Sequence, residues 1–252
     1  AFKAIPHAAI AAVIGVAVAG SVLASCASGS TDALTVYSGR DQDIIEPLIQ
    51  GAAGMRLWPP GLLQQVEGWC RERDVFLILD EVMTGFGRTG RMFACEHEGV
   101  IPDFLCLAKG LTGGYLPLAA TMTTRRVFDG FLGDPAGERA FSYGHSYTAN
   151  QLGCAAALAS LEVFREERVI EGLAVKIASL GEMLRPLEAR PAVKTIRQCG
   201  LIAGIELAGE AILGPGVCLA ARKHGLLTRP ISNTVVLMPP LCAGDTELTL
   251  MV

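Results

Sequence analysis

Residues Asp74–Gly114 read DVFLILDEVMTGFGRTGRMFACEHEGVIPDFLCLAKGLTGG, and the first apolar run of this stretch decides the fold. Val75–Leu79 is too short for a helix and is bounded by charge, so it predicts a strand that is buried on both faces of a parallel sheet. Two acids, Asp80 and Glu81, follow at the carboxyl end of this strand. Ligands of open α/β sheets bind at that edge, because the loops that leave the strand ends line a crevice.

A second apolar run, Asp103–Ala108, predicts another strand of the same sheet and ends on Lys109. Two strand ends therefore bring the carboxylate of Asp80 and the amine of Lys109 to one edge. Such a pair suits pyridoxal phosphate, whose aldehyde condenses with a lysine amine and whose ring nitrogen stays protonated beside a carboxylate. A buried strand end would also desolvate the amine and make it nucleophilic near neutral pH. The alternative is that both residues are polar positions that simply follow two core strands.

Residues 80–124, DEVMTGFGRTGRMFACEHEGVIPDFLCLAKGLTGGYLPLAATMTT, resemble the central block of class III (fold type I) aminotransferases. The resemblance is closest to members of biotin synthesis, which transfer an amino group from S-adenosylmethionine to 8-amino-7-oxononanoate. It implies that Lys109 forms the Schiff base with pyridoxal 5'-phosphate, that Asp80 pairs with the pyridinium nitrogen, and that the protein is a homodimer. It also implies an α/β fold, with part of a large cofactor-binding domain (mainly parallel sheet with helices) at residues 51–155 and an α+β small domain at residues 156–252.

The composition narrows the class of protein. The chain has 252 residues, enough for a sizeable core, and a net charge of -4 without a basic cluster, which argues against a nucleic-acid partner. Its eight cysteines lie at least 11 positions apart, so no metal-ligand spacing such as CxxC exists and no metal site is expected. Scattered thiols of this kind fit a reducing compartment.

The beginning of the chain has a different character. Residues 4–31 carry no Asp, Glu, Lys or Arg, and residues 8–24 form an apolar run that suits a secretory signal. The word Leu23–Cys26 resembles a lipoprotein lipobox, in which Cys26 would be lipidated and would tether the chain to a membrane. Residues 1–32 are therefore predicted to be a signal and a polar spacer, although a buried or uncleaved apolar helix is the alternative.

Residues 33–50 resemble the first strand and helix of periplasmic iron(III)-binding proteins, over about 20 residues only. The segment Ile44–Gln50 fits both the iron(III)-binding-protein pattern and the aminotransferase pattern. We therefore expect two unrelated coding sequences to be joined there. An exported beginning conflicts with the cytoplasmic location that the enzyme portion implies.

The remaining elements follow from periodicity. Helices are expected at 61–73, with Leu62, Leu63, Val66, Trp69 and Cys70 on the apolar face, and at 151–166, 173–187 and 217–224. Inward positions of the helix at 151–166 are expected to be Leu152, Ala155, Ala156, Leu158, Ala159, Leu161 and Val163. Strands are expected at 116–122, 195–197, 200–207, 225–230 and 235–240. The glycine-rich residues 84–90 should form a loop over the mouth of the cofactor site.

Two further segments carry candidate site residues. Residues 142–151 are similar to the HxxT element of the family, which implies that Thr148 binds the cofactor phosphate of the partner subunit and that Gly144 contacts the substrate. Thr148 could equally cap the helix that follows. Arg229, at the end of a predicted strand, corresponds to the arginine that holds the substrate carboxylate, which a guanidinium can do with two parallel hydrogen bonds. A surface arginine before a turn is the alternative.

The sequence thus predicts the second half of a fold type I transaminase, slightly short at Met251–Val252. Family members carry about another half of chain ahead of Glu46, so weak or absent activity is expected of this chain alone. Two rivals remain open at this stage: a membrane-tethered solute-binding lipoprotein, and a non-functional chimera.

Overall fold

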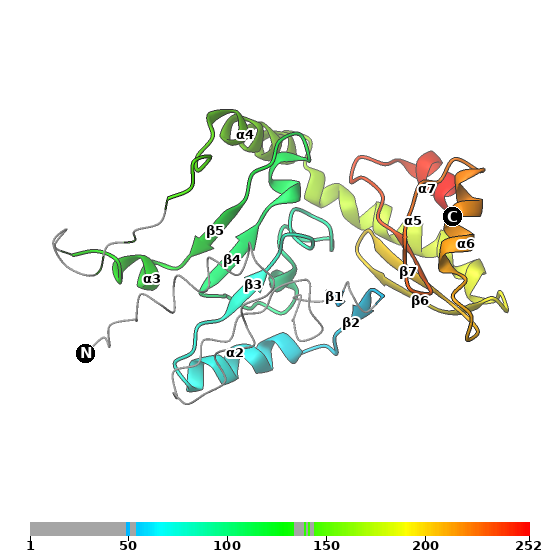
Figure 1. The fold of residues 1–252 in the computed structure, drawn as a ribbon, viewed down its shortest axis with the longest axis horizontal. Helices are drawn as coiled ribbons and strands as arrows, with labels where there is room; N and C mark the ends of the chain where they lie inside the picture. Colours follow the sequence, from blue (N-terminus) through cyan, green and yellow to red (C-terminus); the bar gives the residue numbers. More distant parts are fainter. Residues whose placement is uncertain (1–48, 51–53, 134–138, 140, 142–143) are drawn as a thin grey trace.

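The computed structural model describes residues 49–50, 54–133, 139, 141 and 144–252, and two larger sheets organise them (Figure 1). The first sheet has the order β3-β4-β5, and its strands are β3 Ile78–Asp80, β4 Phe104–Leu107 and β5 Ala120–Thr123. β3 and β4 are parallel, whereas β5 joins β4 antiparallel. The α/β class is confirmed, and the described part of this sheet is mixed, with one parallel and one antiparallel pair.

β3 is shorter than the apolar run that predicts it. The ladder starts at Ile78 because the preceding amide, that of Leu77, donates to the Asp103 carboxylate at 3.0 Å instead of to a strand. Leu77, Ile78 and Leu79 are nevertheless only 1–3% exposed, so burial is confirmed for these three residues, whereas Val75 and Phe76 are half-buried. This burial holds the following acids at a rigid strand end.

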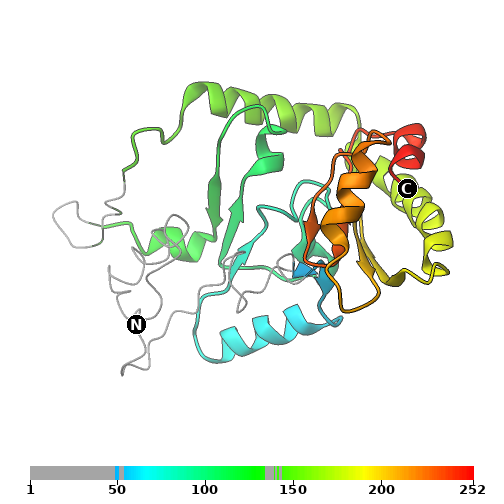
Figure 2. The same ribbon diagram turned by 45° about the vertical axis from the view of Figure 1, so that its right-hand side comes forward.

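Helix α2, Leu62–Glu72, covers the first sheet beside β3 (Figure 2). Leu63 and Cys70 are buried against Leu77 and Leu79. The Glu98 carboxylate caps the helix start, since it accepts hydrogen bonds from Gly61 N at 2.9 Å and Gln64 N at 3.1 Å.

The expectation that Trp69 belongs to the buried face of α2 is wrong. Its side chain is 45% exposed. The Arg73 guanidinium lies 4.6 Å from the ring centroid, so the ring is covered by a cation rather than by the core.

Helix α4, Gln151–Glu166, has the predicted bounds but not the predicted inward face. The buried positions are the small residues Gly153 and Ala157, which let the helix approach the short helix η4, Lys109–Thr112. Leu152 and Leu158 are 71% and 69% exposed. Leu152 and Leu158 therefore point away from the first sheet, whereas Phe164 packs inward against Phe86.

The second sheet has the order β6-β7-β9-β8 and makes the larger core with helix α5, Val169–Glu188, which lies along it (Figure 1). Its antiparallel strands are β6 Val193–Cys199, β7 Ile202–Leu207, β8 Pro230–Ile231 and β9 Thr234–Leu237. Helix α5 packs on it through Leu173, Leu180 and Leu184, which are at most 2% exposed. The predicted strands at 195–197, 200–207 and 235–240 are confirmed as β6, β7 and β9.

Residues 84–90 form turns without regular structure, as predicted, and pack between the two sheets. Their place over the mouth of a cofactor site stays a prediction. Thr84, Phe86 and Thr89 are at most 3% exposed. A Cβ on Gly87 would stand 2.9 Å from Leu173 Cδ1 of α5, and one on Gly200 would stand 2.4 Å from Arg88 O. The glycines thus permit close approach of this segment to the second sheet.

A short hairpin, β1 Ile49–Gln50 with β2 Arg56–Leu57, leads into α2. Arg197 of β6 ties the turn of this hairpin to the second sheet. Its guanidinium donates to Gly54 O at 2.7 Å and Met55 O at 3.2 Å, and pairs with Glu206 at 2.6 Å.

The other described elements are short, and their bounds are η3 Ala94–His97, α3 Arg125–Asp129, α6 Gly214–Arg222 and α7 Asp245–Met251. Within the described residues, no helix is both long and apolar enough to cross a membrane. Cys26, the signal and spacer predicted at residues 1–32, and residues 33–48 lie outside the described residues. The predicted domain division between residues 155 and 156 falls inside α4.

Candidate active site

The structure brings Asp80 and Lys109 to the same edge of the first sheet. Asp80 is the last residue of β3 and lies opposite Cys106 in β4, and Lys109 follows β4 two residues after its end. Asp80 is half-buried, and its Oδ1 accepts a hydrogen bond from Val82 N at 2.9 Å. Among the described residues no donor reaches Oδ2. One carboxylate oxygen at this edge is therefore free to bind a ligand.

Cys106 lies opposite Asp80 in the β3–β4 ladder, and Asp80 affects its pKa. Burial and the negative charge of Asp80 both raise the pKa of the Cys106 thiol. Near neutral pH the thiol therefore stays protonated beside Asp80.

Lys109 stands on a backbone that its neighbours hold in place. Its φ is +45°, in the left-handed region that residues with a Cβ seldom adopt. A Cβ on the next residue, Gly110, would stand 2.7 Å from Phe86 Cβ, and Leu111 is buried against Phe86 and Ala157. The packing beneath η4 thus fixes the base of the lysine side chain.

The expectation that the strand end desolvates the Lys109 amine is wrong for the part of the chain that is described. Lys109 is exposed. The strand end stops short of covering it because β4 ends at Leu107 and the chain turns outward into η4.

Glu81 has a structural role that the sequence did not predict. Its side chain is fully buried, and its carboxylate accepts hydrogen bonds from Ala94 N and Cys95 N, both at 2.7 Å, and from Thr84 Oγ1 at 3.0 Å. Glu81 therefore anchors residues 84–95 beneath the strand end. Its neighbour Asp80 is left as the acid of the edge.

Thr148 and Gly144 lie in the exposed segment ahead of α4. The N-cap of α4 is Asn150, whose Oδ1 accepts from Gly153 N at 3.0 Å, so the alternative that Thr148 caps this helix is wrong. Thr148 N instead donates to His145 O at 2.9 Å in a turn. No hydrogen bond or ion pair in the described residues joins Thr148 or Gly144 to Asp80 or Lys109.

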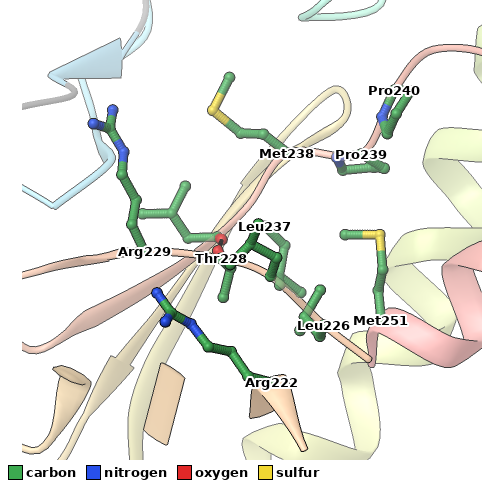
Figure 3. Close-up of a pocket in the computed structure, with 11 residues that line it drawn as sticks. Arg222, Leu226, Thr228, Arg229, Leu237, Met238, Pro239, Pro240 and Met251 are labelled. Atoms are coloured by element: carbon green, nitrogen blue, oxygen red, sulfur yellow. Dashed lines mark hydrogen bonds between the residues drawn. The ribbon is translucent and has the colours of Figure 1, made fainter. Parts of the chain in front are cut away.

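Arg229 borders a pocket of about 570 Å3 beside the second sheet, away from the edge of Asp80 and Lys109 (Figure 3). It lies in an extended segment, 226–229, ahead of β8, so the predicted strand ending at Arg229 is wrong. This segment stays off the sheet ladder, although Thr228 Oγ1 donates to Val236 O. None of Asp80, Lys109 and Thr148 lines the pocket.

Arg88, in the glycine-rich segment, is a second residue that sequence reasoning missed. Its guanidinium donates to Pro239 O at 2.5 Å and approaches Leu201 O at 3.5 Å. Burial lowers the pKa of this guanidinium. The sequence offered one signal for this contact. Arg88 lies among glycines, which allow another backbone segment to approach closely.

Comparisons with known proteins agree on one family. The family described as aminotransferase class-III matches residues 43–252. The chain is 51% identical over 219 residues to an adenosylmethionine-8-amino-7-oxononanoate aminotransferase of Nitratidesulfovibrio vulgaris, covering 83% of this chain and 40% of that protein. For the protein of the same description from Geobacter sulfurreducens, the identity is 46%, over 83% of this chain and 48% of that protein.

The fold gives the same relationship. The crystal structure of adenosylmethionine-8-amino-7-oxononanoate aminotransferase from Methanocaldococcus jannaschii superposes with a TM-score of 0.78 at 43% identity, over 81% of this chain and 50% of that one. The chain spans about half the length of the relatives that it matches. By sequence and by fold, this chain belongs to the class III aminotransferase family.

Proposed function

We propose that this chain takes part in amino transfer with pyridoxal 5'-phosphate, from S-adenosylmethionine to 8-amino-7-oxononanoate. The observation that supports the cofactor is the pair of neighbouring strand ends, which carry the half-buried carboxylate of Asp80 and the exposed amine of Lys109. The substrates are those in the names of relatives that are 46% and 51% identical to it.

The residues of the edge fit the cofactor. When bound, pyridoxal phosphate supplies an electron sink that a protein side chain lacks. Asp80 Oδ2, which no described donor reaches, would hold a proton on the ring nitrogen, and Lys109 Nζ would attach the cofactor and later move a proton at the substrate carbon. The rigid backbone under η4 serves this role because it fixes where the amine can reach.

The remaining roles are proposed for residues away from this edge. Thr148 would donate its hydroxyl to the cofactor phosphate of a partner subunit in a homodimer, which agrees with its exposure. Arg229 would bind the carboxylate of the acceptor, and Gly144 would contact the same substrate.

Covalent labelling tests the proposal. The full chain is incubated with pyridoxal phosphate, reduced with borohydride and mapped by peptide mass spectrometry. We expect a pyridoxyl group mainly on Lys109, less of it in Asp80→Asn, and none at that position in Lys109→Ala. Lys223→Ala, which removes another exposed lysine, is the matched control and should leave labelling at Lys109 unchanged. Equal labelling of surface lysines, with no preference for Lys109, would refute the cofactor site.

For the beginning of the chain we propose a separate role as a membrane tether through Cys26, joined to an iron(III)-binding-protein-like segment. The family match starts at residue 43, so residues 1–42 need another account. Palmitate labelling of cells that produce the chain should mark wild type and not Cys26→Ser. Equal incorporation of palmitate in both proteins would refute the proposed tether.

A further inference from the structure

Phe86 links the strand end that carries Asp80 to the backbone of Lys109. The amide of the residue before Phe86 donates to Glu81 O at 2.9 Å, so a tight turn leads from the end of β3 to Phe86. The Phe86 side chain then lies against Gly110, the residue after the lysine. A Cβ on Gly110 would stand 2.7 Å from Phe86 Cβ and 2.9 Å from Phe86 Cδ2. One side chain therefore connects the end of β3 with the first turn of η4.

Phe86 is itself held in place. Its side chain is only 3% exposed, and its ring meets that of Phe93 edge-to-face, with 5.8 Å between centroids, and that of Phe164 at 6.4 Å. The φ of Phe86 is +56°, in the same left-handed region as the +45° of Lys109. Residues with a Cβ keep this conformation only where the surrounding packing holds them in it. The packing therefore fixes both residues.

Ser160 of α4 holds the same glycine through its carbonyl. Its Oγ donates to Gly110 O at 3.4 Å, and a Cβ on Gly113 would stand 3.9 Å from this Oγ. Ser160 is half-buried, and Ala157 of the same helix packs on Leu111 of η4. The first turn of η4 is thus held by α4 as well as by Phe86.

We propose that Phe86 and Ser160 are positioning residues for the Lys109 amine. Both act through the backbone of Gly110, and Phe86 also sets where that backbone lies relative to the strand end of Asp80. The inference rests on the proposed function in taking Lys109 as the amine that attaches the cofactor. An amine held at a fixed point reacts faster, because less motion has to be lost in reaching the reacting arrangement.

Hydrogen exchange of the full chain without cofactor tests whether these residues hold η4. Leu111 N donates to Ala108 O at 3.0 Å and Gly113 N donates to Gly110 O at 3.1 Å, so these two amides report the opening of η4. In Phe86→Leu, peptides that cover η4 should exchange roughly ten-fold faster, because the contact beneath the glycine is lost. Wild-type exchange of these peptides in Phe86→Leu would overturn the proposal.

Phe93→Leu is the matched control for the ring. It removes a ring from the same cluster, whereas the three atoms nearest to a Cβ on Gly110 all belong to Phe86. Exchange of η4 should change by less than about two-fold in this control. Equal acceleration in Phe86→Leu and Phe93→Leu would show that any loss of packing in the cluster loosens η4, and would overturn the assignment to Phe86.

Ser160 has its own pair of variants. Ser160→Ala should accelerate exchange of η4 about three-fold, the effect of one hydrogen bond. Ser179→Ala removes a hydroxyl of α5 that donates to Asp245, and should leave exchange of η4 unchanged. Equal exchange in Ser160→Ala and wild type would overturn the role of Ser160. Urea unfolding of each variant shows that it is folded.

The kinetics of pyridoxyl labelling test the effect on the amine. Labelling of Lys109 is followed in time at several concentrations of pyridoxal phosphate. At saturation, Phe86→Leu should label roughly ten-fold more slowly than wild type. The half-saturating concentration should change by less than about two-fold, because Asp80 is unaltered. A wild-type labelling rate, or a change in the half-saturating concentration alone, would overturn the proposal.

The two measurements separate this inference from the proposed function. Wild type without preferential labelling of Lys109, together with faster exchange in Phe86→Leu and Ser160→Ala, would refute the proposed function. Phe86 and Ser160 would then still be the residues that hold the backbone of Lys109. Preferential labelling in wild type, with unchanged labelling rate and exchange in Phe86→Leu, would overturn the inference and leave the proposed function.

Discussion

Two adjacent acids, Asp80 and Glu81, have different roles because their environments differ. Within the described residues, Asp80 accepts a hydrogen bond with only one oxygen, whereas Glu81 turns inward and accepts three hydrogen bonds. A fully buried carboxylate with backbone donors stabilises the segment that supplies them. The same side-chain chemistry thus serves ligand binding at one position and folding at the next.

Replacing Glu81 should therefore cost much more stability than replacing Asp80. Glu81→Ala leaves the amides of Ala94 and Cys95 buried without an acceptor, so the free energy of unfolding should fall by about 3 kcal/mol or more. Asp80→Asn keeps an oxygen for Val82 N and should cost less than about 1 kcal/mol. Urea denaturation followed by circular dichroism measures both. Similar losses in the two variants would contradict the assignment of roles.

Lys109 carries backbone strain that its side chain does not relieve. Its φ of +45° costs a residue with a Cβ about 1 kcal/mol relative to glycine. Lys109→Gly should therefore unfold with a free energy about 1 kcal/mol higher than Lys109→Ala, although both lose the pyridoxyl label. Thermal unfolding of the two variants without cofactor provides the comparison, and a less stable glycine variant would show that the conformation is not strained.

The residues of the edge could be predicted from sequence because each follows an apolar run at a strand end. Glu81, Arg88 and the cap residue Asn150 could not be placed in this way. Their partners lie on segments whose spatial neighbours the sequence does not reveal, such as Pro239 for Arg88. Local pattern indicates where a chemical group leaves an element, whereas its hydrogen-bond partner depends on tertiary packing.

At the scale of elements, β6 and β7 share an ion-pair network that also holds the β1–β2 hairpin. Lys194 and Arg197 both donate to Glu206, and these hydrogen bonds lower the pKa of Glu206 from its ordinary value of 4.5. A carboxyl group whose pKa is lower in the folded state adds stability above pH 4.5. That contribution disappears as the pH falls through the folded-state pKa.

Arg197→Gln should consequently be most destabilising at neutral pH. The variant loses the pairing with Glu206 and the bonds to Gly54 O and Met55 O, so its free energy of unfolding should be lower by about 2 kcal/mol at pH 7. The gap to wild type should narrow below pH 4.5, because Glu206 becomes protonated in both proteins. Urea unfolding between pH 3 and pH 7 measures the gap, and a gap that is independent of pH would assign the effect to the hairpin bonds alone.

Element bounds were more predictable than element faces. The periodicity of residues 151–166 gives the limits of α4, since Asn150 and the charged end at Glu166 delimit it. Its fully buried positions are the small residues Gly153 and Ala157, because close approach to η4 requires them, and Phe164 packs on the same face near the end of the helix. A rule that places the leucines of α4 inward therefore fails at Leu152 and Leu158.

At the scale of the whole molecule, the described chain has two larger hydrophobic cores and two smaller clusters, and residues 84–90 lie between the larger cores. One core lies beneath α2 and β3, and the other lies between α5 and the second sheet. Helix α4 leaves apolar side chains uncovered on its outer side. Leu152, Ala155, Ala159 and Val163 recur at helical spacing there, and each is exposed.

An uncovered apolar stripe of this kind favours association with another apolar surface. We expect the full chain to self-associate at micromolar concentration, and the double variant Leu152→Gln/Val163→Gln to do so less, since it removes the two largest side chains of the stripe. Its free energy of unfolding should change by less than about 0.5 kcal/mol, because neither side chain is packed in a core. Light scattering after size-exclusion chromatography gives the mass of each variant. Arg165→Gln, which changes an exposed residue of α4 outside the stripe, is the control and should retain the mass of the wild type. An unchanged mass in the double variant would mean that another surface carries the association.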